Sequence, residues 1–339
     1  MEEKFLFSMD ELSEEHGEFV GRKCANLGVI KKIGLAVPPG FALSVHAYKE
    51  FMSKTKAGEE IKEYLQEFKD PLTTIEQFNT VSKKIRQIVE SKEMPENLKK
   101  EILENYRELN RQCGITDVAV STRSAGPISH PGQYETHLNV KGETELLEKI
   151  KKVWSSSFNS RSLAVRAKNS LQLESDPIGV AVLKMINARA AGVLFTADPN
   201  TGDASTMIIE ANWGLGESVV GGEVMPDIFL VDRDTEKPVK KTLGTKKKYI
   251  TAGEKGIVEK DTPEEKRSVF CLSDMEISEI VRKGKALENR FNTHQDVEWA
   301  IDDDLSYPEN IILLQTRAEV IAPKKDPLDQ IGDLMMKLF

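Results

Sequence analysis

The sequence is poor in the features that mark secreted, zinc-bound or membrane proteins. Its three cysteines, Cys24, Cys113 and Cys271, stand far apart and are odd in number, so their spacing indicates neither a disulfide framework nor a zinc site. No apolar run reaches the length of a membrane span, and the Met-Glu-Glu-Lys start lacks the apolar core of a signal peptide. These absences predict a soluble cytoplasmic protein, because a reducing compartment keeps thiols free.

An excess of basic residues is also missing. The 339 residues include 47 Lys+Arg and 55 Asp+Glu, which gives a formal net charge of -8. This balance argues against general nucleic-acid binding, which needs a basic surface. A nucleotide site stays open, because it needs only local positive charge. The length suffices for two domains or one two-lobed unit.

The most informative stretch runs from Gln295 to Arg317. Alternation with period two puts Asp296 and Glu298 on one strand face, with apolar residues on the other. After an acidic turn, Gln315 and Arg317 share a face of a second strand. Oxygen ligands of this kind suit a magnesium ion carrying phosphates, and an arginine fork suits phosphate oxygens. A solvated strand face with a cross-strand salt bridge explains the same pattern, so both interpretations stay open.

A second candidate phosphate site lies near the N-terminus. The segment Gly21–Gly28 reads Gly-Arg-Lys-Cys-Ala-Asn-Leu-Gly and predicts a turn that enters a helix. Backbone N–H groups at a helix start, together with Lys23, suit a phosphate. The segment is not a Walker A loop, because the two-glycine spacing and the Lys-Ser/Thr pair are missing. A capping loop with a surface lysine explains the segment equally well.

Farther along, a β run at residues 118–121 delivers Arg123 into the small residues 124–126, where backbone amides can approach a ligand closely. The charged residues from about 59 to 112 have helical periodicity and predict a scaffold with solvated faces. The chain becomes rich in β runs near Val180.

These segments, in this order, resemble the N-terminal nucleotide-binding part of the phosphoenolpyruvate synthase and pyruvate phosphate dikinase family. The resemblance covers about Val20 to Arg317 and implies an α+β, two-lobed ATP-grasp fold with the nucleotide between the lobes. The implied lobes are 1–190, with a helical insertion at about 55–112, and 191–321, followed by a linker and terminal helix at 322–339. The motifs that carry the resemblance are Gly21–Gly28, Val37–Phe41, Thr122–Ala125, Gly192–Pro199, Trp213–Glu217, Asp296–Ala300 and Leu314–Arg317.

The resemblance also implies roles for individual residues. Lys23 and Arg123 would hold the phosphates of ATP, and Arg317 would bind the phosphate being transferred. Phosphoryl transfer depends on neutralising charge and on positioning more than on a reactive side chain. The positions implied to organise magnesium, with manganese as an alternative, are Asp296, which also counts among the ATP-binding positions, Glu298 and Gln315. The other positions implied near ATP are Met185 and Ile186 at the adenine hinge, Glu217, and Thr196 and Lys246 at the phosphate end.

The sequence departs from the family pattern at several places. Arg22 replaces a usual glycine, Leu183 stands where glutamine is common, and the loop between Ser124 and Gly132 is shorter than in phosphoenolpyruvate synthases. Family members continue beyond the position of Arg317 into a swivelling domain with a phosphorylatable histidine. None of the five histidines here has the small-residue Thr-Ser-His-Ala-like context of that residue.

An ATP-grasp unit without its histidine must phosphorylate a partner. We therefore expect the small subunit of a phenylphosphate synthase, which cleaves ATP to AMP, places the β-phosphate on a histidine of a larger subunit and releases the γ-phosphate. Phenol would then take the phosphate. One alternative is an isolated ATP-binding domain of a phosphoenolpyruvate synthase or a rifampicin phosphotransferase. An alternative of another class is a non-catalytic nucleotide-binding regulatory subunit, which would not need the full set Lys23, Arg123, Glu298, Gln315 and Arg317.

Overall fold

The computed structural model describes residues 4–68, 70–126 and 134–321. Two predicted features lie outside these ranges. One is the loop at 127–133, which includes His130, and the other is the linker and terminal helix at 322–339. Within the described ranges, no helix combines the length and the apolar character that crossing a bilayer requires.

The described residues form two compact units. Unit 1 takes those within Met1–Asn187, Ile250–Glu259 and Ile312–Gln315, and unit 2 takes all the others. Unit 1 therefore includes two later segments of the chain, the inner residues of a hairpin and part of a late strand.

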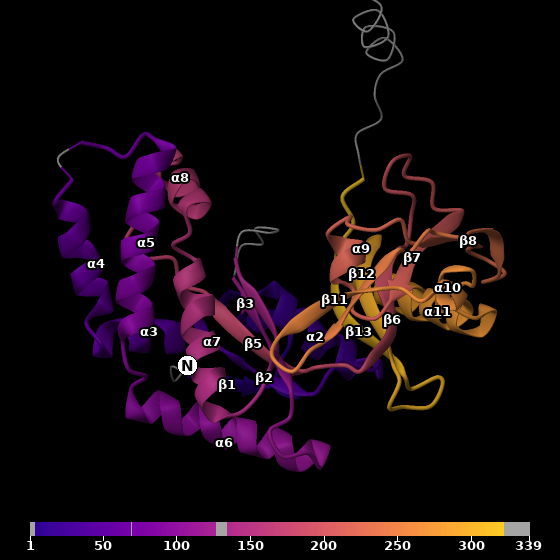
Figure 1. Ribbon diagram of the computed structural model, residues 1–339, viewed down its shortest axis with the longest axis horizontal. Helices are drawn as coiled ribbons and strands as arrows, with labels where there is room; N and C mark the ends of the chain where they lie inside the picture. Colours follow the sequence, from indigo (N-terminus) through magenta and orange to yellow (C-terminus); the bar gives the residue numbers. More distant parts are fainter. Residues whose placement is uncertain (1–3, 69, 127–133, 322–339) are drawn as a thin grey trace, which may run out of the picture. The chain divides into compact units, whose positions relative to one another are not determined.

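Unit 1 is built on a five-stranded sheet with the order β1-β2-β5-β3-β4 (Figure 1). The neighbouring strands β1/β2, β2/β5, β5/β3 and β3/β4 all pair antiparallel. Its strands are β1 (Leu6–Ser8), β2 (Gly40–Leu43), β3 (Val120–Ala125), β4 (Thr136–Val140) and β5 (Gly179–Lys184). Its helices are η1 (Glu14–His16), α1 (Gly17–Val20), α2 (Arg22–Lys32), α3 (Val45–Lys54), α4 (Ala57–Gln66), α5 (Ile75–Ser91), α6 (Glu96–Cys113), α7 (Glu143–Ser156) and α8 (Ser160–Lys168).

The two faces of this sheet differ because side chains alternate along each strand. Val120, Val180 and Val182 join the apolar core that the helices α3 to α8 complete. The alternate residues Ala181 and Leu183 of β5 line a pocket instead. Burying one apolar face against helices leaves the other face free to carry polar side chains.

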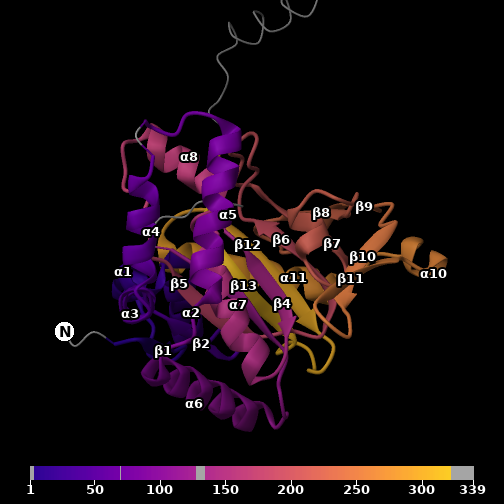
Figure 2. The same ribbon diagram turned by 60° about the vertical axis from the view of Figure 1, so that its left-hand side comes forward.

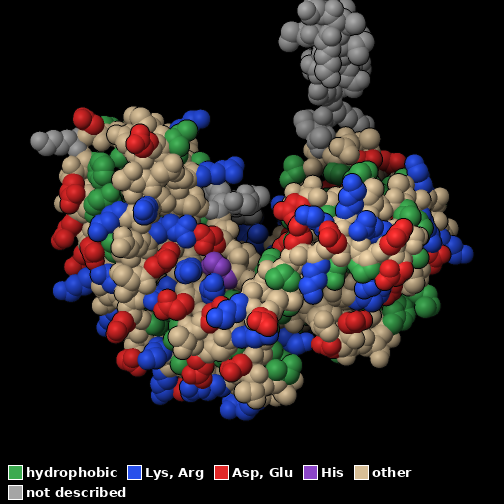
Figure 3. Space-filling view, viewed as in Figure 1, with side chains coloured by type: hydrophobic (Ala, Val, Ile, Leu, Met, Phe, Trp, Pro, Cys, Tyr) green, Lys and Arg blue, Asp and Glu red, His purple; other side chains and the backbone are tan. Residues whose placement is uncertain are grey.

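The predicted helical scaffold is present as α4, α5 and α6. Thr74 and Gln77 form a capping box that begins α5, so the first N–H groups of this helix have partners. Helices α5 and α7 run side by side (Figures 1 and 2). Basic and acidic side chains are interspersed over the outer face of these helices, as expected for solvated surfaces (Figure 3).

Strands β10 (Lys248–Ala252) and β11 (Ile257–Asp261) form a separate hairpin. Its residues Ile250–Glu259, which include the turn, belong to unit 1. Asn139 of β4 is 2% exposed, and its Nδ2 donates to the carbonyl oxygens of Gly253 at 2.8 Å and Gly256 at 2.7 Å. Both amide hydrogens of one asparagine therefore hold the hairpin turn.

Unit 2 is built on a six-stranded sheet with the order β13-β12-β6-β7-β8-β9. Its strands are β6 (Ala188–Phe195), β7 (Thr206–Trp213), β8 (Asp227–Asp232), β9 (Pro238–Thr242), β12 (Gln295–Asp302) and β13 (Ile311–Ala318), of which β13 also contributes residues to unit 1. Its helices are α9 (Glu217–Val220), α10 (Glu264–Arg267) and α11 (Asp274–Phe291).

Helix α11 packs on one face of this sheet. A Cβ added at Gly284 of α11 would lie 2.3 Å from Leu194 Cδ2, so the helix approaches β6 closely. Val297 lies opposite Leu194 in the β12/β6 register and is fully buried, whereas Asp296 lies opposite Phe195. The sequence prediction that acidic and apolar residues alternate across β12 is confirmed.

Candidate functional site

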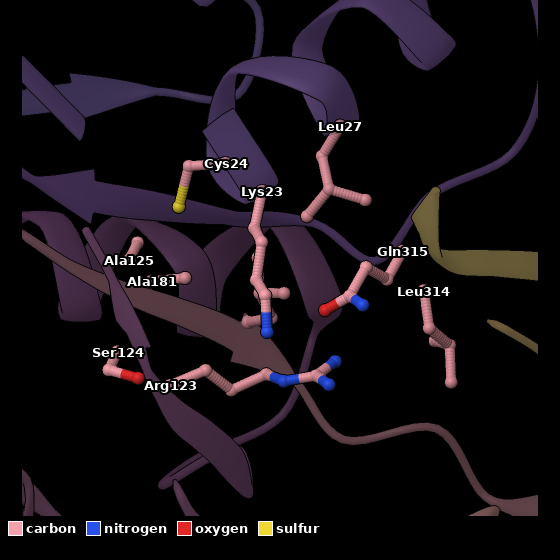
Figure 4. A pocket seen from close by; sticks show the side chains of 10 residues that line it. Lys23, Cys24, Leu27, Arg123, Ser124, Ala125, Ala181, Leu314 and Gln315 are labelled. Atoms are coloured by element: carbon pink, nitrogen blue, oxygen red, sulfur yellow. The ribbon is translucent and has the colours of Figure 1, made fainter. Parts of the chain in front are cut away.

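A pocket in unit 1 brings together three of the predicted site residues. Lys23, Arg123 and Gln315 all line it, and their polar ends point toward one another in Figure 4. The rest of the lining is small or apolar: Cys24, Leu27, Ser124, Ala125, Ala181, Leu183 and Leu314. Two cations thus face a carboxamide, and none of these described lining residues is acidic.

Lys23 projects from the first turn of α2. Gly21 precedes this helix with φ 80°, and its carbonyl accepts the N–H of Ala25 at 3.1 Å. The earlier N–H groups of the first turn have no carbonyl within the helix to bond, so this end of α2 favours an anion. A lysine at the same end adds a full positive charge. The combination fits a phosphate.

Arg123 reaches the pocket from β3, directly across from Ala181 of β5. Close backbone packing fixes β3 against the turn before α2. A Cβ added at Gly21 would lie 2.4 Å from the carbonyl carbon of Ala125, and one added at Gly179 would lie 3.1 Å from the Ala125 oxygen. Glycine at both positions lets the Lys23 turn sit on the end of the Arg123 strand.

Cys24 lines the pocket but is not reactive there. Burial raises the pKa of its thiol to about 12, although the positive charges of Arg123 and Lys23 act in the opposite direction. A thiol with this pKa stays protonated at neutral pH, and only the thiolate is a nucleophile. The pocket therefore suits binding of an anion rather than covalent catalysis by this cysteine.

Gln315 arrives from β13, whose residues 312–315 belong to unit 1. The N–H of Leu313 donates to the carbonyl of Ala36 at 2.9 Å, which ties this part of the strand to the segment before β2. Gln315 itself is 6% exposed. A neutral carboxamide beside two cations offers an oxygen to a metal or an N–H to a phosphate.

Unit 2 holds the predicted acidic face. Asp296 of β12 accepts a hydrogen bond on Oδ2 from Arg317 Nε at 2.7 Å. Glu298 lies two residues farther along β12, on the same strand face, and is half-buried. In the described part of the chain, no three His, Cys, Asp or Glu side chains cluster as a ready-made metal site.

Two predicted phosphate-end residues have other surroundings. Lys246 has zero exposure, and its ammonium is paired with the carboxylate of Asp227, which is also fully buried. Thr196 has zero exposure, and its Oγ1 accepts the N–H of Gln295 at 2.8 Å. A Cβ on Gly284 of α11 would contact its methyl group at 3.4 Å. These contacts give both side chains partners in the interior of unit 2, and their implied place at the phosphate end stays a prediction.

The remaining predictions concern the adenine hinge and Glu217. Met185 and Ile186 follow β5, and the N–H of Met185 donates to the carbonyl of Ala119 at 2.8 Å. This N–H is therefore already used within unit 1, and a base would have to meet other backbone groups. Glu217 is exposed at the start of the four-residue helix α9.

Sequence reasoning missed part of the pocket wall. Leu183 was noted only as a departure from the family pattern, yet it lines the pocket beside Arg123. Alternation along β5 could have shown that it shares a face with Ala181. The packing role of Gly179 had no signal in the sequence, because it depends on which carbonyl oxygens surround it.

Comparison with known proteins identifies the family of the chain. Residues 17–337 match the family described as pyruvate phosphate dikinase, AMP/ATP-binding domain. The chain is 34% identical to the phosphoenolpyruvate synthase of Aeropyrum pernix over 96% of its own length and 43% of that protein. It is 39% identical to the probable phosphoenolpyruvate synthase of Archaeoglobus fulgidus, over 93% of the chain and 42% of that protein.

The chain thus spans less than half the length of these relatives. Helices combined with antiparallel sheets confirm the predicted α+β class, and the matched family has a nucleotide-binding fold of the ATP-grasp type. The chain belongs to the pyruvate phosphate dikinase AMP/ATP-binding domain family.

Proposed function

We propose that this chain binds ATP with Mg²⁺ as the nucleotide-binding part of an ATP-dependent phosphotransferase of the phosphoenolpyruvate synthase type. The observation that carries the proposal is the convergence of Lys23, Arg123 and Gln315 in one pocket. These three residues occupy motif positions in a chain that matches an AMP/ATP-binding domain from residue 17 to residue 337.

The pocket residues would act by binding and orienting phosphates. Lys23 supplies a point charge at a helix N-terminus, and Arg123 supplies a planar fork that fits two phosphate oxygens. Neutralising the phosphate charge in this way lowers the barrier to transfer without a reactive side chain. Arg317, in unit 2, would bind the phosphate that is transferred.

The acidic face of β12 fits a magnesium ion by its donor chemistry. Asp296 and Glu298 offer carboxylate oxygens on one strand face, and the family resemblance adds the Gln315 oxygen. When bound, the metal would neutralise phosphate charge. The carboxylates would hold it, and Arg317 would exchange its bond to Asp296 for one to phosphate.

The reaction proposed for the whole enzyme is transfer of the β-phosphate of ATP to a histidine, with AMP as the leaving group and with water accepting the γ-phosphoryl group, which is released as inorganic phosphate. The histidine would belong to a swivelling domain, either of the same polypeptide or of a larger partner subunit. The relatives named above favour phosphoenolpyruvate synthesis, with pyruvate at the acceptor end, over the phenol phosphorylation that we expected first.

The test uses the protein together with the polypeptide that carries the histidine, and ATP labelled at the β-phosphate. The expected result is AMP and an acid-labile, alkali-stable label on protein, which pyruvate then removes. Removal by phenol instead would support the phenylphosphate synthase alternative. ADP as the lasting product, with no label on any protein, would sink the proposal.

A further inference from the structure

Three buried polar residues of unit 2 meet behind the acidic face of β12. Thr196 has zero exposure, and Gln295 and Thr316 are each 1% exposed. Thr196 directly follows β6, Gln295 begins β12, and Thr316 lies in the later part of β13; these three strands are neighbours in the sheet. Buried polar side chains are costly unless they are hydrogen-bonded, so their contacts show what they hold.

Gln295 is the centre of this group. Its backbone N–H donates to Thr196 Oγ1 at 2.8 Å, and its carbonyl accepts the N–H of Thr196 at 3.0 Å. Its side-chain Oε1 accepts a hydrogen bond from the Thr316 hydroxyl at 2.7 Å. The two hydroxyls thus fix Gln295 to the strands on both sides of β12.

The other end of the Gln295 carboxamide is used as well. Nε2 donates to the carbonyl oxygens of Thr293 at 3.0 Å and His294 at 3.2 Å. This folds the chain just before β12 around the carboxamide. Every polar atom of the Gln295 side chain therefore has a partner. An apolar side chain at this position would leave the Thr316 hydroxyl and the carbonyl oxygens of Thr293 and His294 without these hydrogen bonds.

The group lies on the face opposite the predicted metal ligands. Thr196 and Leu194 lie under Gly284 of α11, and Val297 lies opposite Leu194. The next residue after Gln295 is Asp296, whose carboxylate is bonded to Arg317. Because side chains alternate along a strand, a shift of one residue in β12 would move Asp296 to the α11 face.

We propose that Thr196, Gln295 and Thr316 are positioning residues, which fix the register of β12 against its neighbours and so set the metal-dependent part of ATP binding. This rests on the proposed function, in which Asp296 and Glu298 hold the metal. The hydroxyls act through the strand and touch neither ATP nor the metal.

The test compares variants of the full chain that differ by one hydroxyl. Thr316→Val removes the donor to Gln295 Oε1 while keeping the shape, and Thr316→Ser keeps the donor. Thr262→Val is the matched control, because Thr262 is also buried in unit 2 and its hydroxyl has no hydrogen-bond partner in the described structure. Thr316→Cys, with a weaker donor of similar size, serves if Thr316→Val fails to fold.

Two readouts decide the matter. The first is the ratio of ATP dissociation constants measured in EDTA and in Mg²⁺, which isolates the metal-dependent gain. Thr316→Val should reduce this gain at least fivefold and leave ATP affinity in EDTA within twofold, while Thr316→Ser and Thr262→Val keep the wild-type gain. The second is amide hydrogen exchange of residues 295–298 in the ligand-free chain, which should rise only in Thr316→Val or Thr316→Cys.

The outcomes separate this inference from the proposed function. If the wild type gains no affinity from Mg²⁺, the metal assignment fails, and the exchange data still decide whether the hydroxyls fix the register. If the wild type gains affinity and Thr316→Val keeps that gain in full, the inference is wrong. Equal exchange at 295–298 in Thr316→Val and Thr262→Val would also overturn it.

Discussion

Arg317 binds one carboxylate oxygen of Asp296 with two of its nitrogens. Nε donates to Oδ2 at 2.7 Å, and Nη2 lies 2.6 Å from the same oxygen. The side chain of Asp296 is 11% exposed and that of Arg317 is 50% exposed. The carboxylate is thus held in place while half of the Arg317 side chain stays open to solvent, where a phosphate can reach it.

The first prediction concerns the guanidinium group of Arg317. Arg317→Lys should weaken ATP binding about 10-fold to 100-fold, which corresponds to losing charge-assisted hydrogen bonds that a lysine cannot reproduce. Calorimetric titration with MgATP measures the change. Arg282→Lys is the matched control, because Arg282 is exposed and pairs only with Glu236 and Glu279 among described residues. Equal affinities of the two variants would remove Arg317 from the site.

A second prediction tests Glu298. Glu298→Gln keeps the size of the side chain but removes its charge, so the Mg²⁺-dependent gain in ATP affinity should fall at least about 10-fold. The melting temperature should stay near that of the wild type, because Glu298 is half-buried on the acidic face rather than in the core. Glu264→Gln, in an exposed turn of α10, is the control. An unchanged magnesium effect in Glu298→Gln would show that the metal ligands lie elsewhere.

A third prediction concerns the buried pair of Lys246 and Asp227. Removing one partner leaves a buried charge alone, so Lys246→Met should destabilise the chain by about 3–5 kcal/mol. Asp227 also accepts the N–H groups of Gly244 at 2.8 Å and Cys271 at 2.9 Å. Adding Asp227→Asn to Lys246→Met removes the lone charge and should restore part of the loss.

Denaturant unfolding measures these changes, with Lys247→Met as the surface control that should stay within about 0.5 kcal/mol of wild type. ATP affinity of folded Lys246→Met should match the wild type. A large loss of affinity without a loss of stability would instead return Lys246 to the phosphate site.

The difference between Asp296 and Lys246 shows what the sequence could predict. Alternation along β12 is a local property, so the face that carries Asp296 and Glu298 followed from the order of residues alone. Lys246 stands in a run of three lysines, and the resemblance implied a place for it at the phosphate end. Its burial depends on Asp227, which lies nineteen residues away and gave no signal of pairing.

The surroundings of Thr196 could not be predicted for a related reason. It follows a β run and precedes a turn, which is where ligand-binding hydroxyls often stand. Only the packing of α11 against β6 reveals that it faces the interior. The structural role of Gln295 was not predicted either, because its burial depends on tertiary packing that one sequence does not show. The predicted helical scaffold was sound, because long amphipathic helices carry strong periodicity.

A fourth prediction separates two costs of replacing glycine. Gly21 has φ 80° and Gly34 has φ 83°, so alanine is strained at both. A Cβ at Gly34 meets nothing within 4 Å, whereas one at Gly21 would collide with the Ala125 backbone. Gly34→Ala should therefore lower the free energy of unfolding only through backbone strain, by about 1–3 kcal/mol. Gly21→Ala should lower it by about 1–3 kcal/mol more, because the added methyl group overpacks the contact with Ala125.

Because Gly21 holds the Lys23 turn against the Arg123 strand, Gly21→Ala should also weaken ATP binding in EDTA, and Gly34→Ala should not. Unfolding curves and titrations on both variants provide the comparison. If the two variants lose stability equally, the close contact between Gly21 and Ala125 is not what the alanine disturbs.

The last prediction uses the pH dependence of Glu319. Burial, chiefly, raises the pKa of this carboxyl from 4.5 to about 7, and the negative charges of Asp296 and Asp198 add to the rise. The Ala197 N–H, which donates to Glu319 Oε2 at 3.1 Å, and His294 act in the opposite direction. Between pH 4.5 and about 7 the folded chain keeps a proton that the unfolded chain has lost. The contribution of Glu319 to the free energy of unfolding therefore falls as pH rises through that interval and stays low above it.

Glu319→Gln has no proton to lose and still offers an oxygen to Ala197 N–H. Its melting temperature relative to wild type should therefore rise steadily from pH 4.5 to about 7 and then level off. All other titrating groups are common to both proteins, so their effects largely cancel in the difference. A difference that stays constant across this range would mean that Glu319 titrates in the folded chain as it does in the unfolded one.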